Sequence, residues 1–183
     1  MQVIAGKYKG RKLISIDSIK TRPMLARVKE SIFAMIDEYI PNSTVLDLFA
    51  GSGALGLEAI SRGAKKVYFV DLNKDIKKIL DTNLRRVTED YEILISDYVD
   101  ALNEFKRRGI KFDLILLSPP YKSSFGLDSL SRLASYNLLK PNAVVAYEFE
   151  TKKLLPNIEE KYIIEKTRNY GTASFVLLKY IGE

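Results

Sequence analysis

Short apolar runs alternate with amphipathic segments along most of the chain, and this alternation constrains the fold more than any other feature. From Thr44 onward the apolar runs are TVLDLF, KKVYFVD, YEILISD, FDLILL and AVVAYEFE. Between them lie segments with apolar residues at helical spacing, such as NKDIKKILDTNLRRV and VDALNEFKRRG. Buried strands that alternate with helices predict an α/β fold, in which a parallel sheet is covered by helices on both faces.

The first forty residues follow a different pattern. Residues 2–16 place two short apolar runs around the turn-rich sequence GKYKG, which predicts a β-hairpin. Thr21, Arg22 and Pro23 are typical of a helix start, and apolar residues then recur every three or four positions to about Tyr39. This spacing predicts one buried stripe and leaves three basic residues on other faces of the helix: Arg22, Arg27 and Lys29.

The C-terminal pattern changes again. Residues 161–180 are predicted to form two strands joined by a tight turn at Asn169 to Gly171, an antiparallel hairpin at the sheet edge. No repeat or linker divides the chain, and its 183 residues are within the usual range of one domain. We therefore expect a single domain over residues 1–183, in which a hairpin extension (1–22) precedes the core (23–183).

Two missing residue types exclude much of enzyme chemistry. The chain has no Cys and no His, so disulfides, thiolate metal sites, cysteine nucleophiles and imidazole bases are all ruled out. Carboxylates, hydroxyls, backbone amides, aromatic rings or a bound cofactor must do the work. Residues 1–9 lack the apolar core of a signal peptide, and no apolar run is long enough to span a membrane. We expect a cytoplasmic protein with no metal and no membrane partner.

The positive charge is concentrated at one end of the chain. Residues 1–29 carry eight basic side chains against Asp17 alone, a net charge of +7 in a protein whose total is +6. Such a segment is typical of a phosphate-binding surface, and a solvated surface without a partner is the alternative. The residues that we expect to bind nucleic acid are Lys7, Lys9, Arg11, Lys12, Arg22 and Arg27.

Polar residues or glycines follow each predicted strand, where ligands bind in an open α/β sheet. The sequence Gly51-Ser52-Gly53-Ala54-Leu55-Gly56 follows the first strand and matches a dinucleotide pattern that brings a ligand close to helix N-terminal amides. Asp71 follows the second strand, where a carboxylate accepts hydrogen bonds from ribose hydroxyls. Asp97 follows the third strand, and Ser118-Pro119-Pro120-Tyr121 follows the fourth.

Each of these features has an alternative interpretation. The glycines are compatible with a tight turn that binds nothing, and Asp71 and Asp97 with helix N-caps. Asp47 is harder to explain in that way because it lies inside a buried strand, where an unpaired carboxylate is costly. It is expected to bond loop amides or a ligand ammonium.

Two ligand classes compete for this pattern. A nicotinamide dehydrogenase uses the same glycines and acidic residue, but it normally needs a second domain for its substrate. A nucleobase amino-methyltransferase instead needs what the Ser118–Tyr121 loop offers. The two prolines stiffen the loop and point a carbonyl outward, residue 118 adds an acceptor, and Tyr121 adds a stacking face.

Taken together, these motifs resemble class I S-adenosylmethionine-dependent methyltransferases and, more narrowly, the RsmD family of bacterial guanine-N2 methyltransferases. The resemblance covers nearly the whole chain: VIAGKYKGRKL, TRPMLARVKESIF, LDLFAGSGALGLEAISRGAKKVYFVD, SPPY and RNYGTASFVLL. It implies a Rossmann-like fold, with a mostly parallel seven-stranded sheet, a C-terminal antiparallel hairpin, and an N-terminal β-hairpin and helix. It also implies methylation of the exocyclic N2 amine of a guanine in 16S ribosomal RNA, free or in a small-subunit particle, by a monomer that uses S-adenosyl-L-methionine.

The resemblance also implies roles for individual residues. Asp47, Gly51 and Gly53 would hold the methionine moiety, Asp71 the ribose hydroxyls and Asp97 the adenine amino group. The remaining cofactor contacts would be Phe49, Leu72 and Tyr98. The catalytic residues would be Ser118, Pro119, Pro120 and Tyr121.

One position departs from the family pattern, which is Asp-Pro-Pro-aromatic, because this chain has Ser118 in place of the Asp. Ser-Pro-Pro-Tyr is similar to the loop of N4-cytosine DNA methyltransferases. A DNA amino-methyltransferase acting on cytosine N4 or adenine N6, and a catalytically weak RNA-binding relative, are therefore the alternatives. A neutral hydroxyl is a weaker acceptor than a carboxylate, so Ser118→Asp is expected to speed transfer about five- to tenfold.

Overall fold

The computed structural model describes residues 1–15, 26–152 and 160–182. Its strands are β1 (Thr44–Leu48), β2 (Lys66–Asp71), β3 (Asp90–Ile95), β4 (Phe112–Leu117), β5 (Leu139–Glu150), β6 (Tyr162–Tyr170) and β7 (Ala173–Tyr180). Its α-helices are α1 (Ala26–Ile36), α2 (Ala54–Ser61), α3 (Lys74–Asn83), α4 (Tyr98–Arg107) and α5 (Phe125–Ser135), and a 3₁₀ helix, η1 (Asp37–Tyr39), follows α1.

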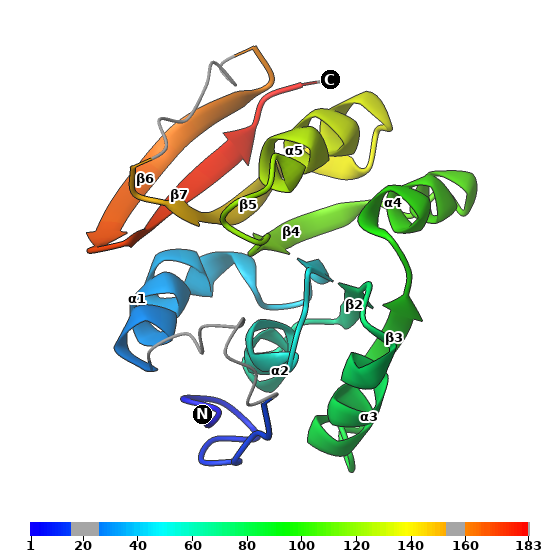
Figure 1. Ribbon diagram of the computed structural model, residues 1–183, viewed down its shortest axis with the longest axis vertical. Coiled ribbons are helices and arrows are strands. Elements are labelled where there is room, and N and C mark those ends of the chain that lie inside the picture. Colours follow the sequence, from blue (N-terminus) through cyan, green and yellow to red (C-terminus); the bar gives the residue numbers. More distant parts are fainter. Residues whose placement is uncertain (16–25, 153–159, 183) are drawn as a thin grey trace.

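All seven strands belong to one sheet with the order β3-β2-β1-β4-β5-β7-β6 (Figure 1). Strands β1 to β5 pair in parallel, whereas β7 is antiparallel to both β5 and β6. Strands β2 and β3 lie on one side of β1, and β4 and β5 on the other, so the strand order changes direction between β1 and β4. Ligands bind at this position in such sheets. This arrangement confirms the predicted Rossmann-like α/β fold.

Helices cover both faces of the sheet, as the unbroken apolar strands require. Helices α1, α2 and α3 lie on one face, and α4 and α5 lie on the other (Figure 1). Each face has its own cluster of buried apolar side chains. No helix in the described part of the chain is both long and apolar enough to cross a membrane.

The N-terminal segment folds back on itself, but with little strand structure. A single antiparallel bridge joins Gln2 to Lys12, and the amides of Val3 and Leu13 donate to the carbonyls of Arg11 and Met1, each at 2.9 Å. The predicted β-hairpin is therefore present as a turn with one bridge. Val3 and Leu13 are buried, which anchors both arms of this turn in the core.

The prediction for Lys29 is wrong. Arg22 and the predicted helix start at Thr21 lie outside the described residues, and Arg27 is exposed as expected. Lys29, however, has no exposed side-chain surface, because Glu58 on α2 provides a buried partner of opposite charge. Apolar periodicity counts only apolar residues, so it cannot detect a lysine that is buried by an ion pair.

The C-terminal hairpin matches its prediction. β6 and β7 pair up to Tyr170 and Ala173, and the Gly171 amide donates to Oδ1 of Asn169 at 2.8 Å. Gly171 has a φ of 80°, a left-handed conformation that favours glycine. β7 lies between β5 and β6, so β6 forms the outer edge of the sheet.

Candidate functional site

The turn from β1 into α2 depends on two glycines for different reasons, Gly51 in the loop and Gly56 in the first turn of α2. Gly51 has a φ of 53°, and no atom lies within 4 Å of the position that a Cβ would take. Gly56 is closely packed, since a Cβ there would lie 2.3 Å from the Phe69 ring. The first turn of α2 therefore packs tightly on β2 at Gly56, whereas the loop is open at Gly51, where its backbone is accessible to a ligand.

Asp47 lies at the base of this loop and is 1% exposed. Its Oδ2 accepts a hydrogen bond from the amide of Gly56 at 2.9 Å, which confirms the expectation that it bonds a backbone amide. Burial raises the pKa of Asp47 to about 8, the Gly56 bond opposes this effect, and the nearby negative charge of Asp71 adds to it. A positively charged ligand group at this position would favour the ionised form.

Asp71 ties the glycine loop to the end of β2. Its two oxygens accept hydrogen bonds from the amides of Gly51 and Asn73, both at 2.9 Å. The N-cap interpretation is wrong for Asp71, because Asn73 caps α3, but it is correct for Asp97, which caps α4 through the amide of Val99. Asp71 thus holds the glycine loop against the end of β2.

An apolar surface lies next to these carboxylates. Leu72, which directly follows Asp71, is 70% exposed. The rings of Phe49 and Tyr98 have centroids 5.4 Å apart, and Phe125 packs 5.0 Å from Tyr98. Sequence reasoning missed Phe125, which begins α5 and carries no motif. The surface offers apolar and aromatic contacts beside hydrogen-bond acceptors, a combination that suits a nucleoside.

The register of β4 and β5 brings Ser118 next to Glu148. Leu117 pairs with Tyr147, so the following residue of each strand is also adjacent. The Ser118 hydroxyl donates to Oε2 of Glu148 at 2.9 Å, and the Tyr121 hydroxyl donates to Oε1 of the same carboxylate. Sequence reasoning missed Glu148, although a charged residue between two buried aromatic residues of a central strand was a usable signal.

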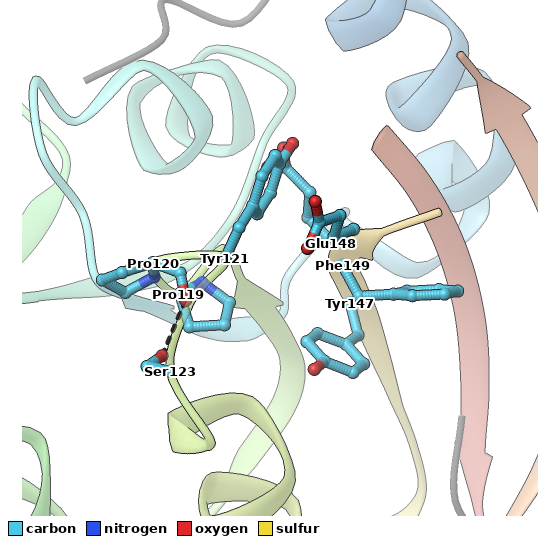
Figure 2. Close-up of a pocket in the computed structure, with 8 residues that line it drawn as sticks. Pro119, Pro120, Tyr121, Ser123, Tyr147, Glu148 and Phe149 are labelled. Carbon is cyan, nitrogen blue, oxygen red and sulfur yellow. Dashed lines mark hydrogen bonds between the residues drawn. The ribbon is translucent and has the colours of Figure 1, made fainter. Parts of the chain in front are cut away.

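Tyr121 and Glu148 also line a pocket between the β4–α5 loop and the end of β5. Figure 2 shows the loop facing β5 across the pocket, which is lined by Pro119, Pro120, Tyr121, Ser123 and residues 147–150. The amide and hydroxyl of Ser123 both donate to the carbonyl of Pro120, at 3.1 and 2.6 Å. Within the described residues no donor reaches the carbonyl of Pro119, so this acceptor is available to a ligand.

A family model described as "Conserved hypothetical protein 95" matches residues 1–179. The ribosomal RNA small subunit methyltransferase D of Haemophilus influenzae is 37% identical over 180 residues, which cover 97% of this chain and 92% of the relative. The chain belongs to the RsmD family.

Solved structures share the fold of this chain. A conserved hypothetical protein of Streptococcus pyogenes is 31% identical and superposes with a TM-score of 0.76, covering 84% of this chain and 95% of that one. A ribosomal protein L11 methylase of Lactobacillus delbrueckii is 20% identical, with a TM-score of 0.69 over 86% of this chain and 80% of that one, and shares the fold. The RsmD-family chain thus has a Rossmann-like methyltransferase fold.

In this RsmD-family chain, part of the basic N-terminal segment is engaged within the protein. Lys7 lies 2.6 Å from Glu89, whose hydrogen bond raises the pKa of Lys7. Arg11 donates to the carbonyl of Arg85. Lys9 and Lys12 are exposed and make no ion pair with the described residues. Because Glu89 immediately precedes β3, Lys7 lies at the amino-terminal end of the sheet, opposite the Ser118 loop.

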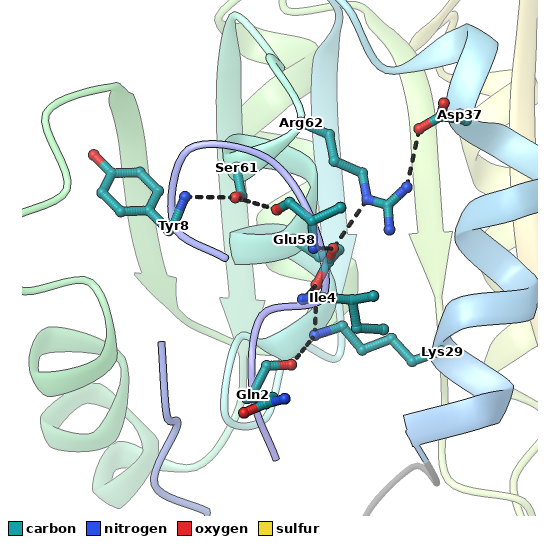
Figure 3. Close-up of polar contacts among 9 residues, drawn as sticks. Gln2, Ile4, Tyr8, Lys29, Asp37, Glu58, Ser61 and Arg62 are labelled. Atoms are coloured by element: carbon teal, nitrogen blue, oxygen red, sulfur yellow. Dashed lines mark hydrogen bonds and ion pairs between the residues drawn. The ribbon is translucent and has the colours of Figure 1, made fainter. Parts of the chain in front are cut away.

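A buried carboxylate anchors the same segment of the RsmD-family chain. Figure 3 shows Glu58 between Lys29 and Arg62. Its oxygens lie 2.8 Å from Lys29 Nζ and 2.9 Å from Arg62 Nε, and they also accept the amides of Ile4 and Ala5 at 2.8 and 3.0 Å. This network fixes the path of the first residues against α1 and α2.

Proposed function

We propose that this protein transfers a methyl group from S-adenosylmethionine to the N2 amine of a guanine in 16S ribosomal RNA, as a cytoplasmic monomer. The observation that carries the proposal is the arrangement of loops at the carboxyl ends of the parallel strands. The glycine loop and Asp71 lie at the ends of β1 and β2, and the Ser118–Tyr121 loop lies at the end of β4, next to β1. A donor site and an acceptor site are therefore neighbours across the switch point.

The residues present fit S-adenosylmethionine. Its ammonium matches the buried carboxylate of Asp47, and the open side of Gly51 leaves room for the methionine chain. Its ribose hydroxyls match Asp71, whose oxygens each have a further lone pair. Leu72 and the Tyr98 ring would contact its adenine, and Asp97 would accept from the adenine amino group. When bound, the cofactor supplies a methyl group already activated by a sulfonium.

The loop after β4 binds and orients the base that accepts the methyl group. The target amine has its lone pair delocalised into the base, and acceptors on its two N–H groups favour the geometry that attacks the methyl group. Ser118 and the carbonyl of Pro119 are these acceptors. Tyr121 stacks on the base, a contact worth roughly 1–3 kcal/mol. The base must be unpaired to reach the Ser118–Tyr121 loop, which suits a single-stranded or flipped nucleotide of a folded RNA.

The name of the Haemophilus influenzae relative supports ribosomal RNA of the small subunit as the substrate. The +7 charge of residues 1–29 is consistent with a polyanionic substrate. The second candidate is a DNA amino-methyltransferase acting on cytosine N4 or adenine N6, and it rests on the Ser118-Pro119-Pro120-Tyr121 sequence alone.

The test is incubation with methyl-labelled S-adenosylmethionine and, separately, 16S RNA, small-subunit particles and duplex DNA. Nucleoside analysis of each product then identifies the base. We expect N2-methylguanosine in RNA or particles. Methylcytosine or methyladenine in DNA would support the second candidate, and absence of any product would identify a binding protein without methyltransferase activity.

A further inference from the structure

Glu148 is a carboxylate at the end of a central strand, and two hydroxyls converge on it. The donors are Ser118, at 2.9 Å from Oε2, and Tyr121, bonded to Oε1. Both come from the β4–α5 loop, and each bonds a different oxygen. Within the described residues no lysine or arginine forms an ion pair with Glu148, so hydroxyl groups are its partners. The proposed roles of Ser118 and Tyr121 do not account for this convergence.

The direction of these bonds fixes what Ser118 offers to a ligand. An ionised carboxylate can only accept hydrogen bonds, so the hydrogen of each hydroxyl points toward Glu148. The lone pairs of Ser118 Oγ therefore remain for another donor. A hydroxyl that already donates to a negative charge is itself a stronger acceptor, because hydrogen bonds in a chain polarise one another.

We propose that Glu148 is a positioning residue for methyl transfer, which acts through Ser118 and gives this hydroxyl the acceptor strength of a carboxylate. The inference rests on the proposed function, because it assumes that an amine N–H is the donor to Ser118. The Ser118–Glu148 pair then takes the place of the aspartate in the family pattern Asp-Pro-Pro-aromatic. The negative charge is supplied by β5, at the next position in the strand register, and not by the loop itself.

The same chain of bonds accounts for the proton that the reaction releases. As the methyl carbon bonds to the amine nitrogen, its bond to sulfur breaks and the electron pair stays on sulfur. The nitrogen becomes positively charged and gives one N–H proton to Ser118 Oγ, while the Ser118 hydroxyl proton passes to Oε2 of Glu148. Charge and atoms balance, and the proton leaves to solvent from Glu148 before the next turnover.

This arrangement reverses the expectation for Ser118→Asp. In the S118D variant the new carboxylate would lie beside the unchanged Glu148. Two adjacent carboxylates cannot both remain ionised without strong repulsion. One of them would take up a proton or move out of the site. The Asp variant should therefore lose activity, and activity should return when Glu148 is also made neutral.

The experiment measures single-turnover transfer with saturating cofactor for the natural protein, E148Q, S118D and the double variant S118D/E148Q. Glu165→Gln is the matched control, because Glu165 also accepts a tyrosine hydroxyl, that of Tyr39 at 3.1 Å, but on the exposed strand β6. We expect a roughly five- to tenfold lower rate for E148Q, the difference between a charged and a neutral acceptor. E165Q should match the natural protein.

The rescue distinguishes this role from a structural one. S118D should also be slower than the natural protein, and S118D/E148Q should be faster than either single variant. Binding of S-adenosylhomocysteine and the melting temperature should stay unchanged across the set, so that the loss appears in the rate and not in affinity. An E148Q rate equal to that of the natural protein, or a double variant no faster than E148Q, would overturn the inference.

The outcome also separates this inference from the proposed function. If the natural protein forms N2-methylguanosine and E148Q is equally fast, only the role of Glu148 fails. If the natural protein forms methylcytosine, the guanine assignment fails, whereas the rescue in the same assay still decides the role of Glu148. No transfer to any of the three polymers would overturn both.

Discussion

The Nζ atom of Lys29 lies 2.8 Å from Oε2 of Glu58, and neither side chain has any exposed surface. Burial lowers the pKa of Lys29, and the bond with Glu58 opposes this effect. Burial also acts against the charge of Glu58, but its bonds with Lys29, the Ile4 amide and Arg62 outweigh burial and lower its pKa. The pair remains charged because hydrogen bonds from three segments of the chain surround it.

Removing one partner of this pair should be costly. We expect Lys29→Met to lower the free energy of unfolding by about 3–5 kcal/mol, because it removes the fully buried cation beside Glu58 and leaves Arg62 as the remaining cation on this carboxylate in the described part of the chain. Urea titration measures the effect. Lys77→Met is the control, since Lys77 pairs with Asp81 at 2.8 Å on the exposed face of α3, and its loss should cost less than about 1 kcal/mol. Equal losses in the two variants would contradict the account.

Asp47 should make stability depend on pH. Its pKa is raised from 3.8 to about 8, so between these values the folded state holds a proton that the unfolded state releases. The free energy of unfolding should therefore fall as pH rises through this window, by up to about 1.4 kcal/mol per pH unit. Asp47→Asn keeps an oxygen for the Gly56 amide and should remove this component. Parallel pH curves for the two proteins would contradict the prediction.

The same carboxyl should release a proton when the cofactor product binds. At pH 7 a group with a pKa of about 8 is mostly protonated, and an adjacent ammonium would ionise it. We expect S-adenosylhomocysteine to release a substantial fraction of one proton, seen in calorimetry as a binding enthalpy that changes with the ionisation enthalpy of the buffer. Asp47→Asn should abolish that buffer dependence.

Asp71 should contribute strongly to cofactor affinity. Asp71→Ala removes a charged acceptor from the ribose hydroxyls and frees the amide of Gly51, so S-adenosylhomocysteine binding should weaken by about 1.5–3 kcal/mol. Calorimetry measures this loss. Asp75→Ala removes the same charge from the first turn of α3 without touching the glycine loop and should leave affinity unchanged. An unaltered affinity in Asp71→Ala would remove this residue from the site.

The basic N-terminal segment should contribute to RNA affinity through its exposed lysines. Replacing Lys9 and Lys12 by Ala should weaken RNA binding and reduce the slope of log affinity against log salt by about one for each phosphate that the segment no longer neutralises. The double variant Lys77→Ala/Lys111→Ala carries the same charge change elsewhere and should affect binding less. If both double variants bind RNA alike, the segment is a solvated surface without a specific role.

Deletion of residues 1–20 would be a poor test of this segment. Val3 and Leu13 are buried in the core. The amides of Ile4 and Ala5 bond Glu58, so their loss would leave this buried carboxylate with fewer donors. A truncated protein should therefore lose stability, and an effect on RNA methylation would not report on charge alone.

The sequence predicted the sheet well because its signals are local. Each apolar run of β1 to β5 and the turn near Gly171 can be recognised within a few residues. The glycine loop and Asp47 were also found, since a glycine pattern and a carboxylate in a buried strand stand out within one segment.

The features that were missed depend on residues far apart in the chain. Lys29 is buried only because Glu58 lies opposite it, and Ser118 meets Glu148 only through the register of β4 and β5. Asp71 was expected to bind ribose or to cap a helix, and its bond to Gly51 links two loops that the sequence treats separately. Pair relationships of this kind follow from the assembled sheet and not from local pattern.

The position of β7 inside the sheet has a consequence for folding. Strand β5 pairs with β4 on one side and with β7 on the other, and β7 is the last strand in chain order. During synthesis, β5 therefore exposes an unpaired edge with apolar residues until residues 173–180 emerge. An unprotected strand edge is where nascent chains associate with one another. Chaperone dependence during translation, and aggregation of chains that stop before β7, should therefore be characteristic of this protein.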